Sequence, residues 1–180
     1  MQTPSDEQLM LKVRDGDPDA FEQIVLRHQA AVWRTAHRFV SDEAEAEDLA
    51  QKAFLRILDA APRYKPTASF RTFLFRVLTR LCLDHLEKKL PQYVDQLPER
   101  PDESSSPEHL ARLGERDAAI QDALNELPTN QRMAVVLRYF EGMGAADCAE
   151  ALGVSAKAVE RLLARARGAL EPRLKDLLEY

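Results

Sequence analysis

The stretch that decides the fold is GVSAKAVERLLARAR, which runs from Gly153 to Arg167. It follows the alanine-rich run AADCAEAL, so that Gly153 separates two helix-forming segments. A tight turn between helices often requires a positive φ, which glycine adopts without steric cost. Ser155 stands where a side-chain oxygen can cap the second helix. The pattern predicts a helix-turn-helix, although a three-helix bundle with a glycine turn would produce a similar pattern.

The charge on the second segment favours an approach to a polyanion. From Ser155 to Lys175 six cations stand against two anions, which gives +4 in a chain whose formal net charge is −5. Such segregation fits a helix laid against DNA phosphates. The apolar positions expected to join the two helices are Ala149, Leu152, Val154, Val159, Leu163 and Ala166.

Glu160 stands out because it places a carboxylate early in this basic helix. Glutamate accepts a hydrogen bond from cytosine N4 in the major groove, so Glu160 is a candidate for choosing the DNA sequence. The alternative is a surface residue that is inert or paired with Lys157 or Arg161. The sequence leaves both interpretations open.

The whole chain has the composition of a globular protein. It has 180 residues, of which 45% are hydrophobic and 31% charged, and no run approaches the roughly 18 apolar residues of a membrane helix. The polar N-terminus does not resemble a signal peptide, so we expect a cytoplasmic protein with no membrane insertion. Cys82 and Cys148 are expected to be buried free thiols.

No enzyme motif is recognisable in the chain. The motifs of nucleotide-binding loops, serine hydrolases and zinc proteases are absent, and no nucleophile, base and orienting group form a set. The histidines follow no familiar metal-ligand spacing, namely His28, His37, His85 and His109. We therefore expect no catalytic residue, no metal and no cofactor.

Helix signals dominate the remaining sequence, which predicts an all-α fold. The residues expected to cap helices at their N-termini are Ser5, Asp17, Ser41, Ser69, Thr129 and Ser155, and Gly142 is expected to end the helix that Thr129 begins. From Pro91 to about Pro107 the chain is rich in proline, serine and acids, which predicts a flexible linker. The chain thus divides into two small helical domains, residues 1–90 and 113–180, joined by a linker at 91–112.

Two surfaces of the first domain are candidates for binding. The acidic segment DEAEAEDLAQKAF is either a solvated face favoured by the helix dipole or a docking face with Asp48 and Gln51 beside Leu49. Further on, aromatic residues alternate with cations from Arg63 onward, a composition suited to unpaired bases and phosphates. The alternative is that the phenylalanines pack a core. We expect Phe73 to do so, and Tyr64 to be freer.

The motifs together resemble one family. AEDLAQKAFLRIL, FRTFLFRVLTRLCLDHL and ALNELPTNQRMAVVLRYFEGMGAADCAEALGVSAKAVERLLARARGAL, in this order and spacing, are similar to the extracytoplasmic-function (ECF) group of bacterial sigma factors. The likeness extends from about Glu7 to Leu174 and implies a non-enzymatic subunit that directs core RNA polymerase to promoters. Its two domains would be sigma region 2 and sigma region 4.

The resemblance also implies roles for particular residues. The "DLxQ" residues that would dock on core polymerase are Asp48, Leu49 and Gln51. The residues that would melt and read the −10 element are Arg63, Tyr64, Lys65, Arg71, Arg76, Arg80, His85 and Lys88. The residues that would read the −35 element are Ser155, Lys157, Glu160, Arg161, Arg165 and Arg167. The "ELPxxQR" motif of region 4 is matched by Glu126, Leu127, Pro128, Gln131 and Arg132.

The chain departs from the family where DNA is read. The usual "VKSRL" of the recognition helix is VERLL here, so Glu160 replaces a lysine, and LTR stands in place of an "ArN" stretch before Leu81. The resemblance therefore carries over polymerase docking but not a promoter sequence. The implied partners are core RNA polymerase, promoter DNA and an anti-sigma factor, which in this family is often membrane-tethered.

Two other functions compete with this interpretation. A stand-alone helix-turn-helix regulator would form a homodimer on palindromic operators. A purely protein-binding helical adaptor would tolerate changes at Arg161 and Arg165. The net charge of −5 predicts that the free chain binds promoters weakly, whichever domain makes the contact.

Overall fold

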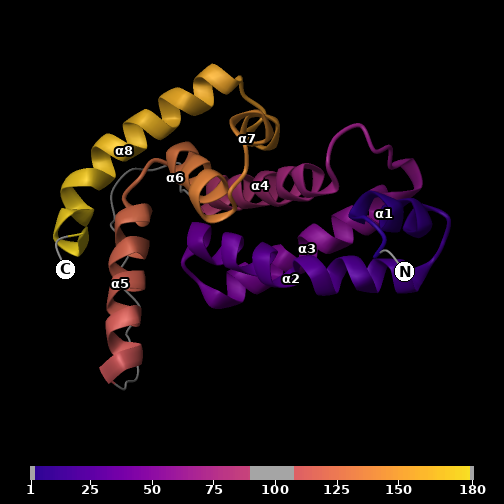
Figure 1. Cartoon of the computed structure of the whole chain (residues 1–180), viewed down its shortest axis with the longest axis horizontal. Helices are drawn as coiled ribbons and strands as arrows, with labels where there is room; N and C mark the ends of the chain where they lie inside the picture. Colours follow the sequence, from indigo (N-terminus) through magenta and orange to yellow (C-terminus); the bar gives the residue numbers. More distant parts are fainter. Residues whose placement is uncertain (1–2, 90–107, 179–180) are drawn as a thin grey trace.

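The computed structural model describes residues 3–89 and 108–178, and every regular element in that part of the chain is helical. A 3-10 turn, η1, and a π-helical segment, η2, interrupt the α-helices. The elements in order are α1 (Asp6–Arg14), α2 (Pro18–Val40), α3 (Glu43–Ala60), η1 (Ala61–Arg63), α4 (Phe70–Lys89), α5 (Glu108–Asn125), α6 (Thr129–Val135), η2 (Val136–Phe140), α7 (Ala145–Leu152) and α8 (Ala156–Leu178). The predicted all-α fold is confirmed (Figure 1).

The predicted linker from Pro91 to Pro107 lies outside the described residues. Helix α5 begins at Glu108, within the 91–112 segment that the sequence assigned to the linker. Helical structure on the second side therefore starts before residue 113.

Four of the predicted caps are confirmed because their hydrogen bonds are local. Ser5 forms a capping box with Gln8 at the start of α1, and the Asp17 carboxylate accepts from two amides of α2. Ser69 Oγ accepts from the Thr72 amide at 3.1 Å. Each of these side chains satisfies backbone amides that have no partner within the helix.

Two predicted caps are wrong. Asp42 caps α3, with its carboxylate accepting from the Glu45 amide at 2.8 Å, while Ser41 ends α2 in the left-handed region at φ 59°. Thr129 is the first residue of α6, and Pro128 occupies the cap position without a side-chain hydrogen bond. In both cases an adjacent residue occupies the cap position, and the predicted serine or threonine does not.

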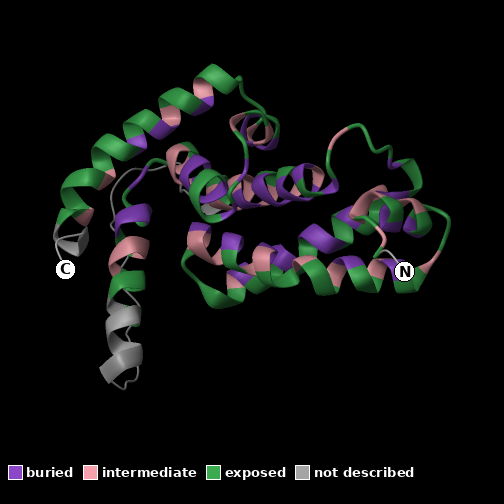
Figure 2. Cartoon of the chain, viewed as in Figure 1, coloured by how far each residue is buried: buried purple, intermediate pink, exposed green. Residues whose placement is uncertain are grey.

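Helices α1 to α4 form the first half of the molecule, with α2 and α3 packed side by side (Figure 1). Figure 2 shows the buried positions on the sides of α2, α3 and α4 that face one another. Phe39, Phe70 and Phe75 are completely buried there, and burial of a side chain of this size stabilises by about 1.5–3 kcal/mol. Phe73, expected in the core, packs only at its edge.

Helices α5 to α8 form the second half, with α8 running along its outer side (Figure 1). Val159, Leu163 and Ala166 are buried on the inner face of α8, as predicted, whereas Val154 in the turn is 39% exposed. Helix α7 packs along α4, and one continuous cluster of buried apolar residues includes both halves. The two halves are therefore in direct contact through α4 and α7.

Candidate nucleic-acid and polymerase interfaces

The helix-turn-helix has the predicted geometry. Gly153 ends α7 in the left-handed region at φ 67° and ψ 32°. The Val154 amide then donates to the Ala149 carbonyl at 3.0 Å, which closes the turn. Ser155 Oγ accepts from the Ala158 amide at 3.2 Å, so that its predicted role as cap of α8 is confirmed.

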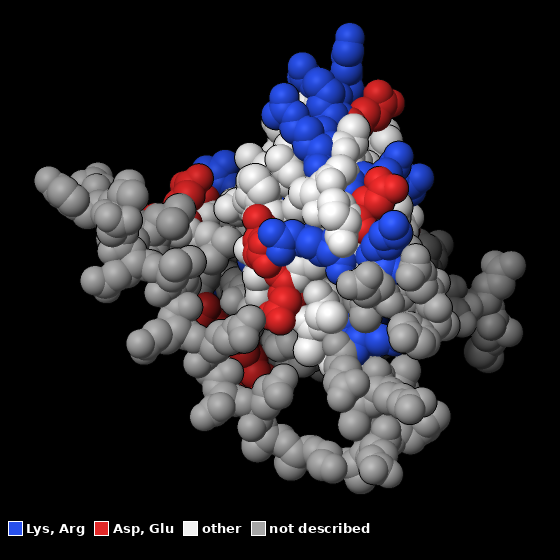
Figure 3. All heavy atoms as spheres, turned by 90° about the vertical axis from the view of Figure 1, so that its left-hand side faces the viewer, with Lys and Arg blue, Asp and Glu red and all other residues white. Residues whose placement is uncertain are grey.

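The outer face of α8 carries the predicted cations. Lys157, Arg161 and Arg165 are all exposed, and Figure 3 shows lysine and arginine side chains gathered over the end of the molecule where α8 begins. Glu160 is exposed among them and forms no ion pair with Lys157 or Arg161. Pairing with these neighbours is therefore not what the structure contains, while a role in choosing the DNA sequence and an inert surface position both stay open for Glu160.

Arg167 is held differently from the other cations of α8. Its Nη2 donates to the hydroxyl of Tyr139 on η2 at 3.3 Å, which turns this guanidinium toward the body of the second half. Arg173, six residues further on, forms an ion pair with Glu126. Three of the four unpaired cations of α8, Lys157, Arg161 and Arg165, thus lie in its first three turns, and the fourth is Lys175.

Helix α3 presents the predicted polymerase-docking residues unequally. Asp48 and Gln51 are exposed, and each makes only a local contact, Asp48 with Lys52 and Gln51 with Glu47. Leu49 is only 2% exposed and packs in the core. The polar residues of the motif are therefore available to a partner, while Leu49 fixes the orientation of the helix.

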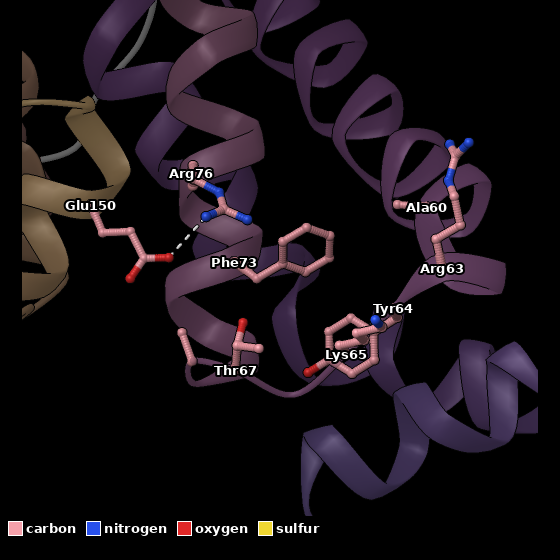
Figure 4. Close-up of a pocket in the computed structure, with 9 residues that line it drawn as sticks. Ala60, Arg63, Tyr64, Lys65, Thr67, Phe73, Arg76 and Glu150 are labelled. Carbon is pink, nitrogen blue, oxygen red and sulfur yellow. Dashed lines mark hydrogen bonds and ion pairs between the residues drawn. The ribbon is translucent and has the colours of Figure 1, made fainter.

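A cavity lies between the loop after η1 and the start of α4 (Figure 4). Its volume is about 320 Å³, and its lining includes Arg63, Lys65, Phe73 and Arg76. Arg63 and Lys65 are exposed at the loop, and the Phe73 ring is partly accessible. The predicted mixture of aromatic and cationic side chains therefore meets at one site.

The position of Tyr64 at this cavity differs from the prediction. It was expected to be freer, but it is only 6% exposed, with its ring centroid 5.6 Å from that of Phe73. Burial, together with the nearby carboxylates of Glu7 and Asp6, raises the pKa of the Tyr64 hydroxyl above its usual range. The Tyr64 ring belongs to the wall of the cavity, because the core beneath it offers more apolar contact than solvent does.

Two of the predicted −10 residues on α4, Arg71 and Arg76, have partners in the second half of the chain. Arg71 Nη2 donates to the Glu141 carboxylate at 2.9 Å and to the Glu141 carbonyl at 2.7 Å. Arg76 Nη1 donates to the Glu150 carboxylate at 2.9 Å, and both side chains line the cavity (Figure 4). Glu141 and Glu150 could not be predicted as partners of these arginines, since nothing in their neighbourhood along the chain indicates contacts some 70 residues away.

Neither a metal site nor a membrane span is found in residues 3–89 and 108–178. No three metal-ligating side chains lie together in that part of the chain, and none of its helices is long and apolar enough to cross a bilayer. Cys82 and Cys148 are buried free thiols, as predicted, and burial raises the pKa of Cys82 to about 12.

Comparison with known proteins decides the family. Residues 24–90 match the family model for sigma-70 region 2, and residues 117–170 match that for sigma-70 region 4. The chain is 30% identical to the RNA polymerase sigma-H factor of Pseudomonas aeruginosa, over 96% of this chain and 95% of that one. It is 33% identical to the ECF sigma factor SigM of Mycobacterium tuberculosis, over 98% and 86%. The chain belongs to the ECF RNA polymerase sigma factors.

Solved structures agree with this assignment. The sigma factor CnrH, solved with the cytosolic domain of CnrY, is 29% identical with a TM-score of 0.74, over 96% of this chain and 99% of that one. RpoE of Bartonella quintana, solved with the anti-sigma factor NepR, shares the fold at 21% identity and a TM-score of 0.66, over 86% and 96%. The likeness to CnrH extends over both halves of the chain.

This sigma factor directs core RNA polymerase to promoters and initiates transcription, as the resemblance implied. The other predicted −10 residues of the sigma factor lie further along α4. Arg80 pairs with Asp84 at 3.2 Å, His85 with Glu45 at 3.0 Å, and Lys88 is exposed. At a rise of 1.5 Å per residue, Arg71 and Lys88 are about 26 Å apart along the helix axis. The set is therefore spread along and around α4 rather than gathered at a single binding point.

Proposed function

We propose that three surfaces of this sigma factor divide the work of initiation. Asp48 and Gln51 on α3 dock on core polymerase, the loop and α4 bind the −10 element, and the first three turns of α8 read the −35 element. Supporting this division, the cations of α8 are exposed and largely unpaired in a chain whose net charge is −5. The single observation that carries it is the capped α7–α8 turn, which presents that basic face outward.

At the −35 element, Lys157, Arg161 and Arg165 supply phosphate or base contacts from the major groove, where a helix fits. Glu160 lies between them without an ion-pair partner among the described residues, so its carboxylate is free to accept a hydrogen bond from a cytosine amino group. Arg167, bound to Tyr139, contributes less than the others in this conformation.

At the −10 element, the cavity beside the loop receives an unstacked base. Phe73 offers a partly accessible ring for stacking, and Arg63 and Lys65 are exposed at its rim to neutralise phosphates. Removing a base from the stack costs a few kcal/mol, which these contacts offset. Further along α4, Arg80 and Lys88 are exposed and can neutralise further phosphates of the strand.

Chemistry stays with the core polymerase, and the sigma factor acts by binding alone. Its place of action is then the cytoplasm, where the polymerase and the chromosome are. The two structural relatives were solved with CnrY and with an anti-sigma factor, which supports control of this chain by an anti-sigma factor of its own.

In vitro transcription with core polymerase over a randomised promoter library tests the proposal. We expect initiation from a defined set of promoters. Glu160→Lys should change the bases selected at −35, whereas Arg165→Ala should weaken initiation on all of them and reduce its salt dependence. Arg14→Ala, an exposed arginine of α1 remote from α8, serves as the control. Failure of the folded protein to initiate from any promoter would refute the proposal.

A further inference from the structure

Three carboxylates of the second half lie against the start of α4. They come from the end of η2 and from α7, and they contact side chains on one face of the first two turns of α4. The pairs are Arg71 with Glu141, Thr72 with Asp147, and Arg76 with Glu150. These contacts join regions of the sequence that the family models describe separately.

Glu141 is the most deeply placed of the three. Its side chain is 6% exposed, yet both carboxylate oxygens have partners, Thr35 Oγ1 at 2.8 Å and Arg71 Nη2 at 2.9 Å. Thr35 is itself completely buried on α2. A buried carboxylate is retained only where hydrogen bonds and an opposite charge compensate its loss of hydration. The Glu141 site is therefore specific for the closed arrangement, in which the second half of the chain packs against α2 and α4.

The other two carboxylates extend the contact toward the cavity. Thr72 Oγ1 donates to Asp147 at 2.8 Å, and Thr72 is almost fully buried. Arg76 and Glu150 meet at 2.9 Å with roughly half of the Arg76 side chain exposed. Glu150 also lines the −10 cavity (Figure 4), so that a residue of region 4 forms part of the wall of a site on region 2.

A second set of contacts fixes the opposite end of the same arrangement. Arg132 Nη1 donates to the Phe39 carbonyl at 2.7 Å, and Gln121 Nε2 donates to the Arg38 carbonyl at 2.9 Å. The Arg38 guanidinium lies 4.3 Å from the centre of the Phe140 ring. The two halves are thus held at both ends of their interface.

We propose that the face of η2 and α7 bearing Glu141, Asp147 and Glu150 is a carboxylate surface that occupies the promoter-binding side of α4 in the free sigma factor. Carboxylates and DNA phosphates are both anionic acceptors for the same guanidinium groups, so closure and −10 binding compete. This inference rests on the proposed −10 role of Arg71 and Arg76. It explains how a sigma factor without polymerase keeps its −10 surface from DNA.

Competition has a measurable consequence for affinity. A binding-competent state that is populated only in a small fraction lowers the apparent affinity by that fraction. The open state is the one in which the second half has left α4. If loss of the Asp147 and Glu150 carboxylates raises its population from about 1% to about 10%, the affinity for a −10 strand rises about tenfold. The Arg71 and Arg76 side chains are about half exposed in the closed form. Opening therefore releases their carboxylate partners and leaves both guanidinium groups on the surface for DNA.

The test uses the full chain carrying Asp147→Asn and Glu150→Gln, two exchanges that keep side-chain size and leave the buried Glu141 in place. The matched control is Glu22→Gln with Asp122→Asn, exposed acids on α2 and α5 whose loss changes net charge equally. Spin labels on cysteines introduced at Arg56 on α3 and Ala169 on α8, both exposed, report the distance between the halves without any DNA. A fluorescent single-stranded −10 oligonucleotide reports affinity.

We expect one short label distance in the wild type and the control, and a longer, broader distribution in the double variant with about tenfold tighter oligonucleotide binding. Unchanged distances in the variant would overturn the role of the carboxylates. Longer distances with unchanged oligonucleotide affinity would overturn masking while leaving closure in place. Adding Arg71→Ala and Arg76→Ala to the open double variant tests the proposed −10 role of these arginines separately from masking. If their removal does not weaken binding of the oligonucleotide, the proposed −10 role fails.

Discussion

Replacing Gly153 by alanine measures the backbone cost of the turn that presents α8. Gly153 has φ +67°, and a Cβ added there meets no atom within 4 Å, so steric contact contributes nothing. A non-glycine residue in the left-handed region costs roughly 1–2 kcal/mol. The lower entropy of the unfolded chain with alanine offsets about 0.4–1 kcal/mol of this cost. We expect Gly153→Ala to lower the free energy of unfolding by about 1 kcal/mol.

Gly168→Ala is the matched control on the same helix. Gly168 lies inside α8, is exposed, and has equal space for a Cβ, but its φ is not positive. There alanine should stabilise by about 1 kcal/mol through helix propensity. The same chemical change should thus act with opposite sign, and the two Tm values should differ by about 4–8 °C for a chain of this size.

Urea denaturation with a constant m-value, followed by circular dichroism, gives both free energies. The two sites are far enough apart for the double variant to be additive within about 0.5 kcal/mol. If Gly153→Ala proved as stabilising as Gly168→Ala, the turn would not depend on its left-handed glycine, and the reasoning would be refuted.

Three further outcomes follow from buried and titrating groups. Tyr64→Phe should be neutral or stabilising by up to about 1 kcal/mol in thermal unfolding, because the buried hydroxyl has no hydrogen-bond partner among the described residues; a clear loss of stability would contradict this. Cys82, whose pKa burial raises to about 12 from 9.0, should resist iodoacetamide at pH 8 in the folded chain and react in urea; stability should fall as pH rises above 9, where only the unfolded thiol ionises. Glu7 accepts from the Phe70 amide at 2.8 Å, which lowers the pKa of Glu7. Its contribution to folding stability is therefore present above about pH 4.5 and is lost as the pH falls below that value. Between pH 5 and pH 3 the Tm of Glu7→Gln should fall less than the Tm of the wild type.

Local signals were sufficient for much of the fold and failed where neighbours compete. Asp17 and Ser155 were identified as caps because the donor amides lie two or three residues away. At Ser41 and Asp42 two capping residues stand side by side, and the carboxylate, the stronger acceptor for a helix start, took the position. Propensity alone could not decide between them.

In the candidate sites, too, features set by local sequence could be predicted and features set by distant contacts could not. The exposure of Lys157 and Arg161 followed from helical periodicity, and the structure places both on the outer face of α8. The burial of Tyr64 did not follow, since it depends on α1 and α4 closing over the loop. The pairing of Arg71 with Glu141 spans 70 positions and follows from no local pattern.

The π-helical segment η2 makes the position of Glu141 tolerant of a change in chain length. A π turn takes up one residue more than the α-helical turn that would stand in its place after α6. Deleting one residue between Val136 and Phe140 would therefore restore α-helical spacing and leave Glu141 directed at Thr35 and Arg71, whereas a deletion within an ordinary α-helical turn would rotate it by about 100° about the helix axis. In the divergence of related sequences, this segment is a place where the chain can gain or lose one residue while the contact between the two halves persists.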